Sequence, residues 1–157
     1  ATHMIYSSTD GATWTQVGSI NNGGSYNMRT PQIVAAPVSP AYPAGGDVWV
    51  CDDGTYNGGG GGLWRSTNSA VTWSAISGIG KVTAVGFGKA ASGTGYAVYF
   101  YGYKAGVLGV YRSEDYGVSW TKLVNPTVAP IDYIAGDRQN AGKVFIGTNG
   151  RGVFQAQ

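Results

Sequence analysis

The sequence predicts an all-β protein made of β-propeller blades: about three four-stranded antiparallel blades, forming an incomplete ring unless another copy or chain completes it. Three observations predict this fold: the composition, a turn motif that recurs at blade-like spacing, and strand-like alternation between the motifs. Of the 157 residues, 27 are glycine, 13% are aromatic and 11% are charged. Glycine weakens helices and disordered chains lack aromatic residues, so this composition favours short strands joined by tight turns.

A turn motif of the form Ser-x-Asp or Ser-x-Asn, followed by tryptophan, occurs three times. The copies read YSSTDGATWTQV at 6–17, WRSTNSAVTWSAI at 64–76 and YRSEDYGVSWTKL at 111–123. Their tryptophans, Trp14, Trp73 and Trp120, are separated by 59 and then 47 positions. Propeller blades repeat about every 40–50 residues, so the second spacing fits one blade and the first indicates a loop insertion.

The third copy matches the Asp-box pattern Ser-x-Asp-x-Gly-x-x-Trp in full. We expect Asp115 to accept hydrogen bonds from the backbone of its own turn, Gly117 to adopt a left-handed conformation and Trp120 to pack between sheets. The second copy has Asn68 and Ala70 in place of Asp and Gly, and the first copy is one residue shorter, so we expect its turn to differ. Because all copies share one turn context, we favour a structural role over a catalytic or metal-binding one. The structural motif residues are Ser8, Asp10, Trp14, Ser66, Asn68, Trp73, Ser113, Asp115, Gly117 and Trp120.

Alternation and turn residues between the motifs predict the strands in order, with no helix. A hairpin surrounds the first motif, two complete blades follow, and three strands of a last blade end the chain. The predicted strands are 4–8 and 13–17; 31–36, 47–51, 63–66 and 72–76; 82–88, 96–101, 109–113 and 119–124; and 131–136, 143–147 and 152–156. Residues 1–4 are interpreted as a cloning remnant, and 5–157 as a single partial propeller domain.

Charge, cysteine and histidine content exclude several classes of function. The net charge is +2 and the basic residues are scattered singly, which argues against nucleic-acid binding. Cys51 is the only cysteine and His3 the only histidine, so no Cys-based zinc site, intrachain disulfide or Ser-His-Asp triad is available. No apolar run approaches the roughly 20 residues of a membrane span. We therefore expect no metal, no cofactor and no membrane association.

Candidate binding residues follow from the propeller topology. If the box turns join the third and fourth strands, the connections between second and third strands lie on the opposite face, together with the blade-to-blade links. Tyrosines on these loops offer stacking surfaces and their polar neighbours offer hydrogen bonds, a combination that suits sugars, although tyrosine is also an ordinary loop anchor. The carbohydrate-binding candidates are Tyr26, Asp52, Asp53, Tyr56, Tyr101, Tyr103, Asn149 and Arg151.

A catalytic residue is not identifiable from the sequence. Asp52 and Asp53 are the only adjacent carboxylates, and neighbours on an extended strand point in opposite directions. A glycosidase needs two carboxyl groups about 5–9.5 Å apart across the scissile bond, so this pair is a poor candidate.

Three stretches carry a specific resemblance: TAVGFGKAASGTGYAVYFYG at 83–102, GVYRSEDYGVSW at 109–120 and KVFIGTNGRGVF at 143–154. They resemble the C-terminal propeller region of family 74 glycoside hydrolases, the xyloglucanases, which carry Asp-box (BNR) repeats. The resemblance implies an enzyme of two seven-bladed propellers that hydrolyses the xyloglucan backbone with inversion, using two Asp residues. It also implies a secreted protein. No position of this chain matches either catalytic Asp, so neither role is carried over.

Three hypotheses follow. The first is a xyloglucanase-derived fragment that binds β-glucan chains without cleaving them. The second is an active inverting xyloglucan endo-β-1,4-glucanase once missing blades are supplied. The third is a structural or self-assembling propeller module, because three blades are too few to close a ring and open sheet edges invite pairing. The partners we expect are a polysaccharide and either a second copy of the chain or a complementary propeller chain.

Overall fold

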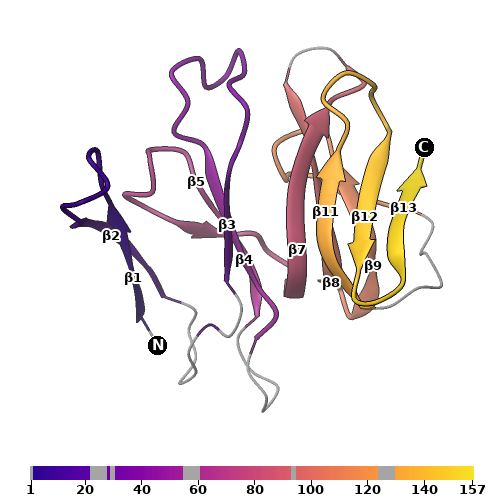
Figure 1. The fold of residues 1–157 in the computed structure, drawn as a ribbon, viewed down its shortest axis with the longest axis horizontal. Helices are drawn as coiled ribbons and strands as arrows, with labels where there is room; N and C mark the ends of the chain where they lie inside the picture. The colour runs from indigo at the N-terminus through magenta and orange to yellow at the C-terminus, as the bar shows by residue number, and fades with distance from the viewer. Residues whose placement is uncertain (1, 22–27, 29–30, 55–60, 93–94, 124–129) are drawn as a thin grey trace.

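The computed structural model describes residues 2–21, 28, 31–54, 61–92, 95–123 and 130–157, which form thirteen strands in four antiparallel sheets and contain no helix (Figure 1). Sheet I consists of β1 (Thr2–Ser7) and β2 (Thr15–Asn21). Sheet II consists of β3 (Gln32–Ala35), β4 (Val48–Asp52), β5 (Gly62–Ser66) and β6 (Ser74–Ala75). Sheet III consists of β7 (Ile79–Lys89), β8 (Tyr96–Lys104), β9 (Val107–Ser113) and β10 (Thr121–Lys122). Sheet IV consists of β11 (Ile131–Gly136), β12 (Val144–Thr148) and β13 (Gly152–Ala156).

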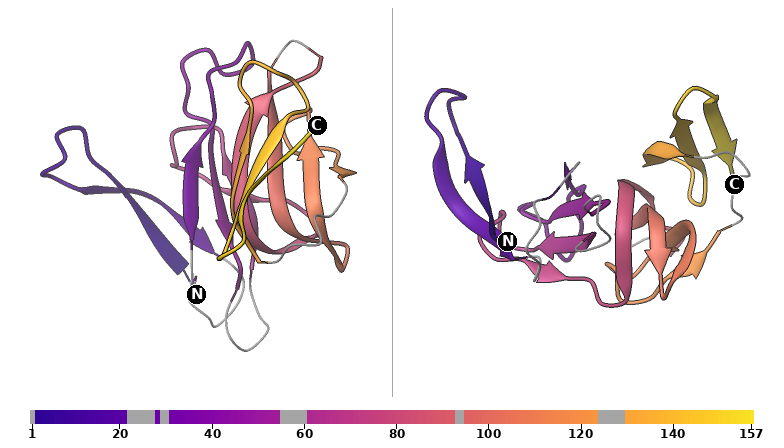
Figure 2. Two further views of the ribbon diagram at one scale, coloured as in Figure 1. Left: turned by 45° about the vertical axis from the view of Figure 1, so that its right-hand side comes forward. Right: turned by 90° about the horizontal axis from the view of Figure 1, so that it is seen from below.

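The prediction of an incomplete propeller is confirmed by this arrangement. Within each sheet the strands lie in sequence order, as in a propeller blade, and no sheet closes on itself. Seen from below, the four sheets follow one another along an open arc, with the N-terminal hairpin at one end and sheet IV at the other (Figure 2). Residues 2–4, which the sequence analysis sets aside, lie in β1 and pair with Ser19–Asn21.

The segment 101–108, between the predicted strands 96–101 and 109–113, is predicted as an irregular loop, and this prediction is wrong. In the structure β8 continues to Lys104 and pairs with β9 in register, Tyr103 opposite Leu108 and Lys104 opposite Val107. Only Ala105 and Gly106 form the turn, and both have positive φ, 48° and 78°. Two left-handed residues in succession produce a tight hairpin whose twist matches that of its strands, so the strands extend further than alternation suggested.

Three apolar clusters lie between successive sheets and account for the two-residue periodicity of the strands. On β8, Tyr96, Val98 and Phe100 pack toward sheet II. The intervening residues Ala97, Tyr99 and Tyr101 pack toward sheet IV. A smaller cluster of Ile20, Val50 and Trp64 joins sheets I and II. Alternate side chains of the central strands thus pack into two different cores, which is why every residue of β8 from Tyr96 to Gly102 is buried.

The first strands of sheets III and IV approach each other closely. A Cβ atom added at Gly86 would overlap the carbonyl oxygen of Ile134, and one added at Gly88 would lie 2.7 Å from the Cα atom of Gly136. Glycine is therefore required on β7 at these positions, because neighbouring backbones meet there. The backbones of β7 and β11 therefore lie side by side in the second half of each strand. The first strands of sheets II, III and IV, which are β3, β7 and β11, are the inner strands.

A buried ion pair within sheet II is hydrogen-bonded to Tyr96 of sheet III. Arg65 donates from Nε to Oδ1 of Asp47 at 2.9 Å and from Nη2 to Oδ2 at 2.7 Å, and the hydroxyl of Tyr96 also donates to Oδ2. The guanidinium lies within 5.0–5.3 Å of the ring centroids of Tyr42, Trp49 and Tyr116. Burial acts to lower the pKa of Arg65, but the hydrogen bond to Asp47 and the nearby charges outweigh it and raise the pKa.

Candidate functional site

A pocket of about 410 Å³ opens at the face where the inner strands begin. It is formed by residues of the inner strands β3, β7 and β11 and by Asp53, which follows β4, so sheets II, III and IV all contribute to it. Its lining residues are Pro31, Gln32, Asp53, Thr83, Asp132 and Tyr133. This is the face opposite the box turns, where the sequence predicts ligand-binding loops.

Irregularities in two inner strands direct side chains into this pocket. The pairing of β7 with β8 shifts register on both sides of Val82, next to Thr83. The pairing of β11 with β12 shifts between Ile131 and Tyr133, so that Asp132 and Tyr133 are both exposed in succession. Bulges turn side chains away from the regular alternation and are frequent beside functional sites. Here they place a hydroxyl, a carboxylate and an aromatic ring at one opening.

Hydrogen bonds to the backbone fix two of the lining residues. The Oε1 atom of Gln32 accepts from the backbone N–H of Val85 at 2.9 Å and from the Cys51 thiol at 3.7 Å. The Thr83 hydroxyl donates to the carbonyl oxygen of Ile131 at 2.9 Å. These bonds join β3 to β7 and β7 to β11, so the floor of the pocket is held by the same contacts that hold the inner strands together.

The lining chemistry matches an uncharged, hydroxyl-rich ligand. The carboxylates of Asp53 and Asp132 can accept hydrogen bonds from hydroxyl groups, the amide of Gln32 can donate, and Tyr133 is largely exposed. No lysine or arginine is among the described residues that line the pocket, so it holds no cation to attract a phosphate or carboxylate. Within the part of the chain that the structure describes, no three metal-ligating side chains group together, and no helix could cross a membrane.

The structure places the candidate binding residues in different environments. Asp53 lines the pocket. Asn149 and Arg151 are exposed in the turn between β12 and β13, and Tyr103 is exposed on β8. Asp52 and Tyr101 are buried, the latter in the core between sheets III and IV, so neither presents a surface to a ligand. Tyr26 and Tyr56 lie outside the described residues.

Sequence reasoning missed five of the six lining residues, Pro31, Gln32, Thr83, Asp132 and Tyr133. Their strands were predicted, but a bulge changes which side chains face outward, and register shifts are set by pairing with a neighbouring strand. One signal was present: Asp132 and Tyr133 are two consecutive non-core residues near the start of an otherwise apolar strand. A break in alternation at a strand end is the pattern that a bulge produces.

The box turns use their polar side chains within the turns themselves. The Asp115 carboxylate accepts the Ser119 N–H from 2.8 Å, and the Ser113 hydroxyl accepts the Gly117 N–H from 2.8 Å. In the second turn, Asn68 accepts the Thr72 N–H at 2.9 Å. For Asp115, burial acts to raise the pKa, but hydrogen bonds from Ser119 and Ser113 outweigh it and lower the pKa. The side chains of Asp115 and Asn68 are therefore hydrogen-bonded within their own turns.

The first box turn differs from the other two, as its shorter sequence suggests. Asp10 accepts the N–H groups two and three positions on, those of Ala12 and Thr13, both at 2.8 Å, whereas Asp115 and Asn68 accept the N–H group four positions on. Only Gly11 has positive φ there, whereas the second and third turns each have two such residues, Ser69 with Ala70 and Tyr116 with Gly117. Trp14 is exposed, while Trp120 packs edge-to-face on Phe100 with ring centroids 4.7 Å apart. The expected packing of the motif tryptophan between sheets therefore does not extend to Trp14.

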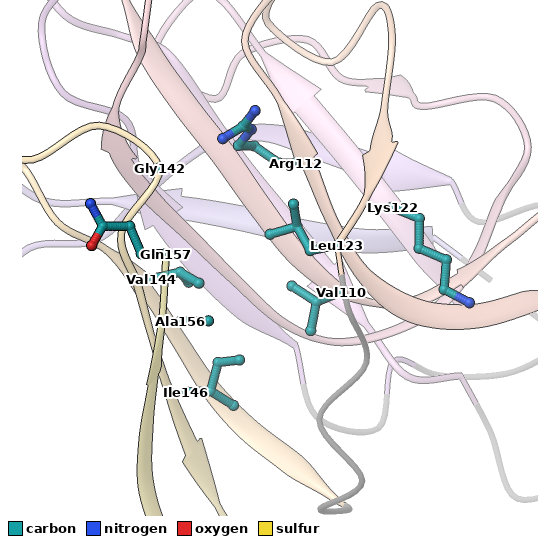
Figure 3. A pocket seen from close by; sticks show the side chains of 9 residues that line it. All are labelled: Val110, Arg112, Lys122, Leu123, Gly142, Val144, Ile146, Ala156 and Gln157. Carbon is teal, nitrogen blue, oxygen red and sulfur yellow. The ribbon is translucent and has the colours of Figure 1, made fainter.

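A second cleft, of about 350 Å³, lies between sheets III and IV (Figure 3). Val110 and Leu123 on one side face Val144 and Ile146 on the other, and Arg112, Lys122 and Gln157 lie at its rim. Its aliphatic walls offer few groups that could orient a sugar. We therefore take the pocket at the loop face as the candidate site.

The fold and the pocket define a partial β-propeller with a polar, aromatic opening on its loop face. Known proteins are similar to this chain in sequence. A xyloglucanase of Paenibacillus sp is 33% identical over 145 residues, covering 88% of this chain and 14% of the relative. An oligoxyloglucan-reducing end-specific xyloglucanase of Emericella nidulans is 33% identical over 168 residues, covering 97% of this chain and 20% of the relative. No family model matches the chain.

A solved structure is similar to this chain in both fold and sequence. The GH74 enzyme of Niastella koreensis superimposes with a TM-score of 0.68 at 31% identity, covering 92% of this chain and 20% of that one. The chain is a relative of the family 74 glycoside hydrolases, as the sequence motifs suggested. It corresponds to between 14% and 20% of the length of these proteins.

Proposed function

We propose that the chain binds β-glucan chains of the xyloglucan type at the pocket on its loop face, without cleaving them on its own. The observation that carries this proposal is the pocket lined by Asp53, Asp132 and Tyr133 in a chain whose relatives are named xyloglucanases. A glucan backbone alternates apolar C–H faces with hydroxyl rims. Tyr133 would stack on a ring face, and the carboxylates and Gln32 would bind the hydroxyl groups.

Isothermal titration calorimetry with xyloglucan oligosaccharides tests the proposal directly. We expect measurable binding to the wild-type chain and a loss of roughly tenfold or more in affinity for Tyr133→Ala, because stacking of one aromatic side chain contributes about 1–3 kcal/mol in related contacts. Trp14→Ala is the matched control: it removes an exposed aromatic ring from the opposite, box-turn face. The absence of heat with wild-type chain at millimolar ligand, or equal losses in the two variants, would refute this assignment.

A hydrolytic function is the second candidate, and one observation favours it. Asp53 and Asp132 come from different sheets and line the same pocket, an arrangement that Asp52 and Asp53 cannot provide because Asp52 is buried. Two carboxyl groups across a sugar are what an inverting glycosidase requires. If the completed protein releases reducing sugar from xyloglucan, Asp53→Asn and Asp132→Asn should each abolish it. Full activity in both variants would exclude this pair.

An extracellular location also remains a proposal, supported by the xyloglucanase relatives. Assembly with a second copy or with a complementary propeller chain is a further part of the proposal, because the outer faces of sheets I and IV are exposed and apolar.

A further inference from the structure

The side-chain amide of Gln32 is held in one orientation. Gln32 pairs with Cys51 across β3 and β4, and its Oε1 atom accepts from the Cys51 thiol at 3.7 Å and from the backbone N–H of Val85 at 2.9 Å. A backbone N–H only donates, and an amide nitrogen does not accept. The contact with Val85 therefore identifies which end of the amide is the oxygen, and Nε2 with its two hydrogens is the end that remains for other partners.

The fold maintains this orientation because a buried backbone group depends on it. β7 is an edge strand of sheet III, and its residue Val85 is 1% exposed. The N–H of Val85 reaches across to sheet II for the Gln32 oxygen. If the amide turned over, this buried N–H would face an NH₂ group, which costs free energy. The donor end of Gln32 is thus set by the protein backbone before any ligand binds.

The other lining groups with a determined hydrogen-bonding role are acceptors. The Thr83 hydroxyl donates its proton to the carbonyl oxygen of Ile131 at 2.9 Å, so toward the pocket it offers only lone pairs. The carboxylates of Asp53 and Asp132 also accept. Among the described residues that line the pocket, Gln32 is the one whose side chain is fixed as a donor.

A glucan contains two kinds of oxygen that this arrangement distinguishes. A hydroxyl group both donates and accepts, so it can bind to a carboxylate. The ether oxygens of the ring and of the glycosidic link only accept, so neither a carboxylate nor the Thr83 oxygen can bind them. Gln32 can donate to them, and so can the Tyr133 hydroxyl, whose proton can rotate toward different partners. An ether oxygen is therefore best placed at Gln32.

We propose that Gln32 fixes the orientation of a β-glucan chain in this pocket, its Nε2 atom donating to an ether oxygen of the backbone while adjacent sugar hydroxyls donate to Asp53 and Asp132. This role rests on the proposed function, that the pocket binds β-glucan, and adds the residue that selects how the chain lies. A chain in another orientation sets an ether oxygen against a carboxylate. Two acceptors then face each other with no proton between them, which disfavours that orientation.

The substitution Gln32→Glu removes the donor and keeps the contact with Val85, because a carboxylate of the same length still offers that N–H an oxygen. Isothermal titration calorimetry with xyloglucan oligosaccharides is run at pH 8, where the introduced carboxyl group is ionised. We expect the affinity to fall about tenfold or more, with a cooperative thermal melt confirming that the variant is folded. Gln139→Glu, at an exposed glutamine in the turn between β11 and β12, adds the same charge elsewhere and should bind like wild type. The uncharged variant Gln32→Met serves if the Glu variant does not fold.

Sulfur-substituted ligands identify the oxygen that Gln32 binds. In one glucan oligosaccharide the glycosidic oxygen is replaced by sulfur and in another the ring oxygen, since sulfur in a thioether is a weak acceptor. Wild type should bind one of the two analogues about two- to tenfold more weakly than the oxygen ligand. In Gln32→Glu this preference should disappear. A residue that only supports the fold would change the affinity for all three ligands by the same factor.

Two results would overturn the role of Gln32 and leave the proposed function standing. One is binding that Tyr133→Ala weakens and Gln32→Glu does not. The other is an equal loss for the oxygen and sulfur ligands in Gln32→Glu. If the wild-type chain binds no glucan at all, the proposed function fails and this role fails with it.

Discussion

Removing the Asp47 carboxylate tests a buried polar cluster in which the Asp47–Arg65 pair of sheet II meets Tyr96 of sheet III. Asp47 has 1% of its side chain exposed and its partner Arg65 has 13%. The substitution Asp47→Ala leaves the Arg65 guanidinium in place without its bidentate acceptor and deprives the Tyr96 hydroxyl of its acceptor. The positive charge would then be enclosed by three aromatic rings and the carbonyl oxygen of Tyr116, which accepts from Arg65 at 3.0 Å.

The expected cost is about 3 kcal/mol of unfolding free energy. Breaking one side of a buried ion pair typically costs about 3–5 kcal/mol, because the remaining charge is buried without its partner. The aromatic rings still attract the cation, by about 0.5–2 kcal/mol each, which places the cost at the lower end of that range. At this chain length, a loss of that size lowers the melting temperature by about 6–12 °C. It lowers the urea midpoint by about 1 M.

Urea unfolding followed by tryptophan fluorescence and circular dichroism measures this loss. The matched control is Glu114→Gln, which removes the charge from the Arg112–Glu114 pair, whose side chains are 28% and 27% exposed at 3.5 Å. An exposed pair contributes less than about 1 kcal/mol, so this control should barely shift the midpoint. If Asp47→Ala costs no more than the control, the buried ion pair and its contact with Tyr96 do not stabilise the fold as argued. The double variant Asp47→Leu/Arg65→Met should recover part of the loss, because it leaves no unpaired charge.

Three further predictions concern single positions. Burial raises the pKa of the Cys51 thiol to about 12, so in the folded chain it should resist alkylation at pH 8 and react only as the protein unfolds; fast labelling under native conditions would contradict this. Hydrogen bonds from the Asn140 side chain and from the Gln139 and Asn140 backbone lower the pKa of Asp137 from 3.8 to about 2. Its stabilisation is therefore present above pH 4 and lost as the pH falls through 2, so Asp137→Asn should be less stable than wild type at pH 7 and this difference should shrink toward pH 2 in thermal melts. Gly86→Ala should cost about 1–3 kcal/mol by overlapping the Ile134 carbonyl, whereas Gly80→Ala, whose Cβ would lie 3.7 Å from Tyr103 Cβ, should be nearly neutral in the same urea assay.

Much of the architecture could be predicted from local sequence. The three turn motifs place the hairpins at β1–β2, β5–β6 and β9–β10, because a Ser and an Asp or Asn bond to their own turn without help from distant residues. The two-residue alternation predicts the strands between them. What could not be read locally is the extension of β8 and β9 across Ala105 and Gly106, which depends on two left-handed residues of which only one is glycine.

The candidate site was predictable only as a face of the molecule. Asp53 was identified because it follows a buried strand in a connection on that face. Tyr101 was predicted on the binding face, but β8 continues past it, and its ring lies in the core between sheets III and IV. Gln32 and Tyr133 join the pocket from strands about 100 residues apart, so no local pattern could group them.

The sequence by itself determined the blade type, the turns and the alternating faces, since each depends on residues within a few positions of one another. The tertiary structure decided which faces are covered, because burial depends on the neighbouring sheet. The aromatic residue two positions before the motif serine is buried at Trp64 and Tyr111 and exposed at Tyr6. The aliphatic residue before the aromatic one is buried at Leu63 and exposed at Val153. The pocket has the same origin: strands from three sheets meet there, joined by the hydrogen bonds of Gln32 to Val85 and of Thr83 to Ile131.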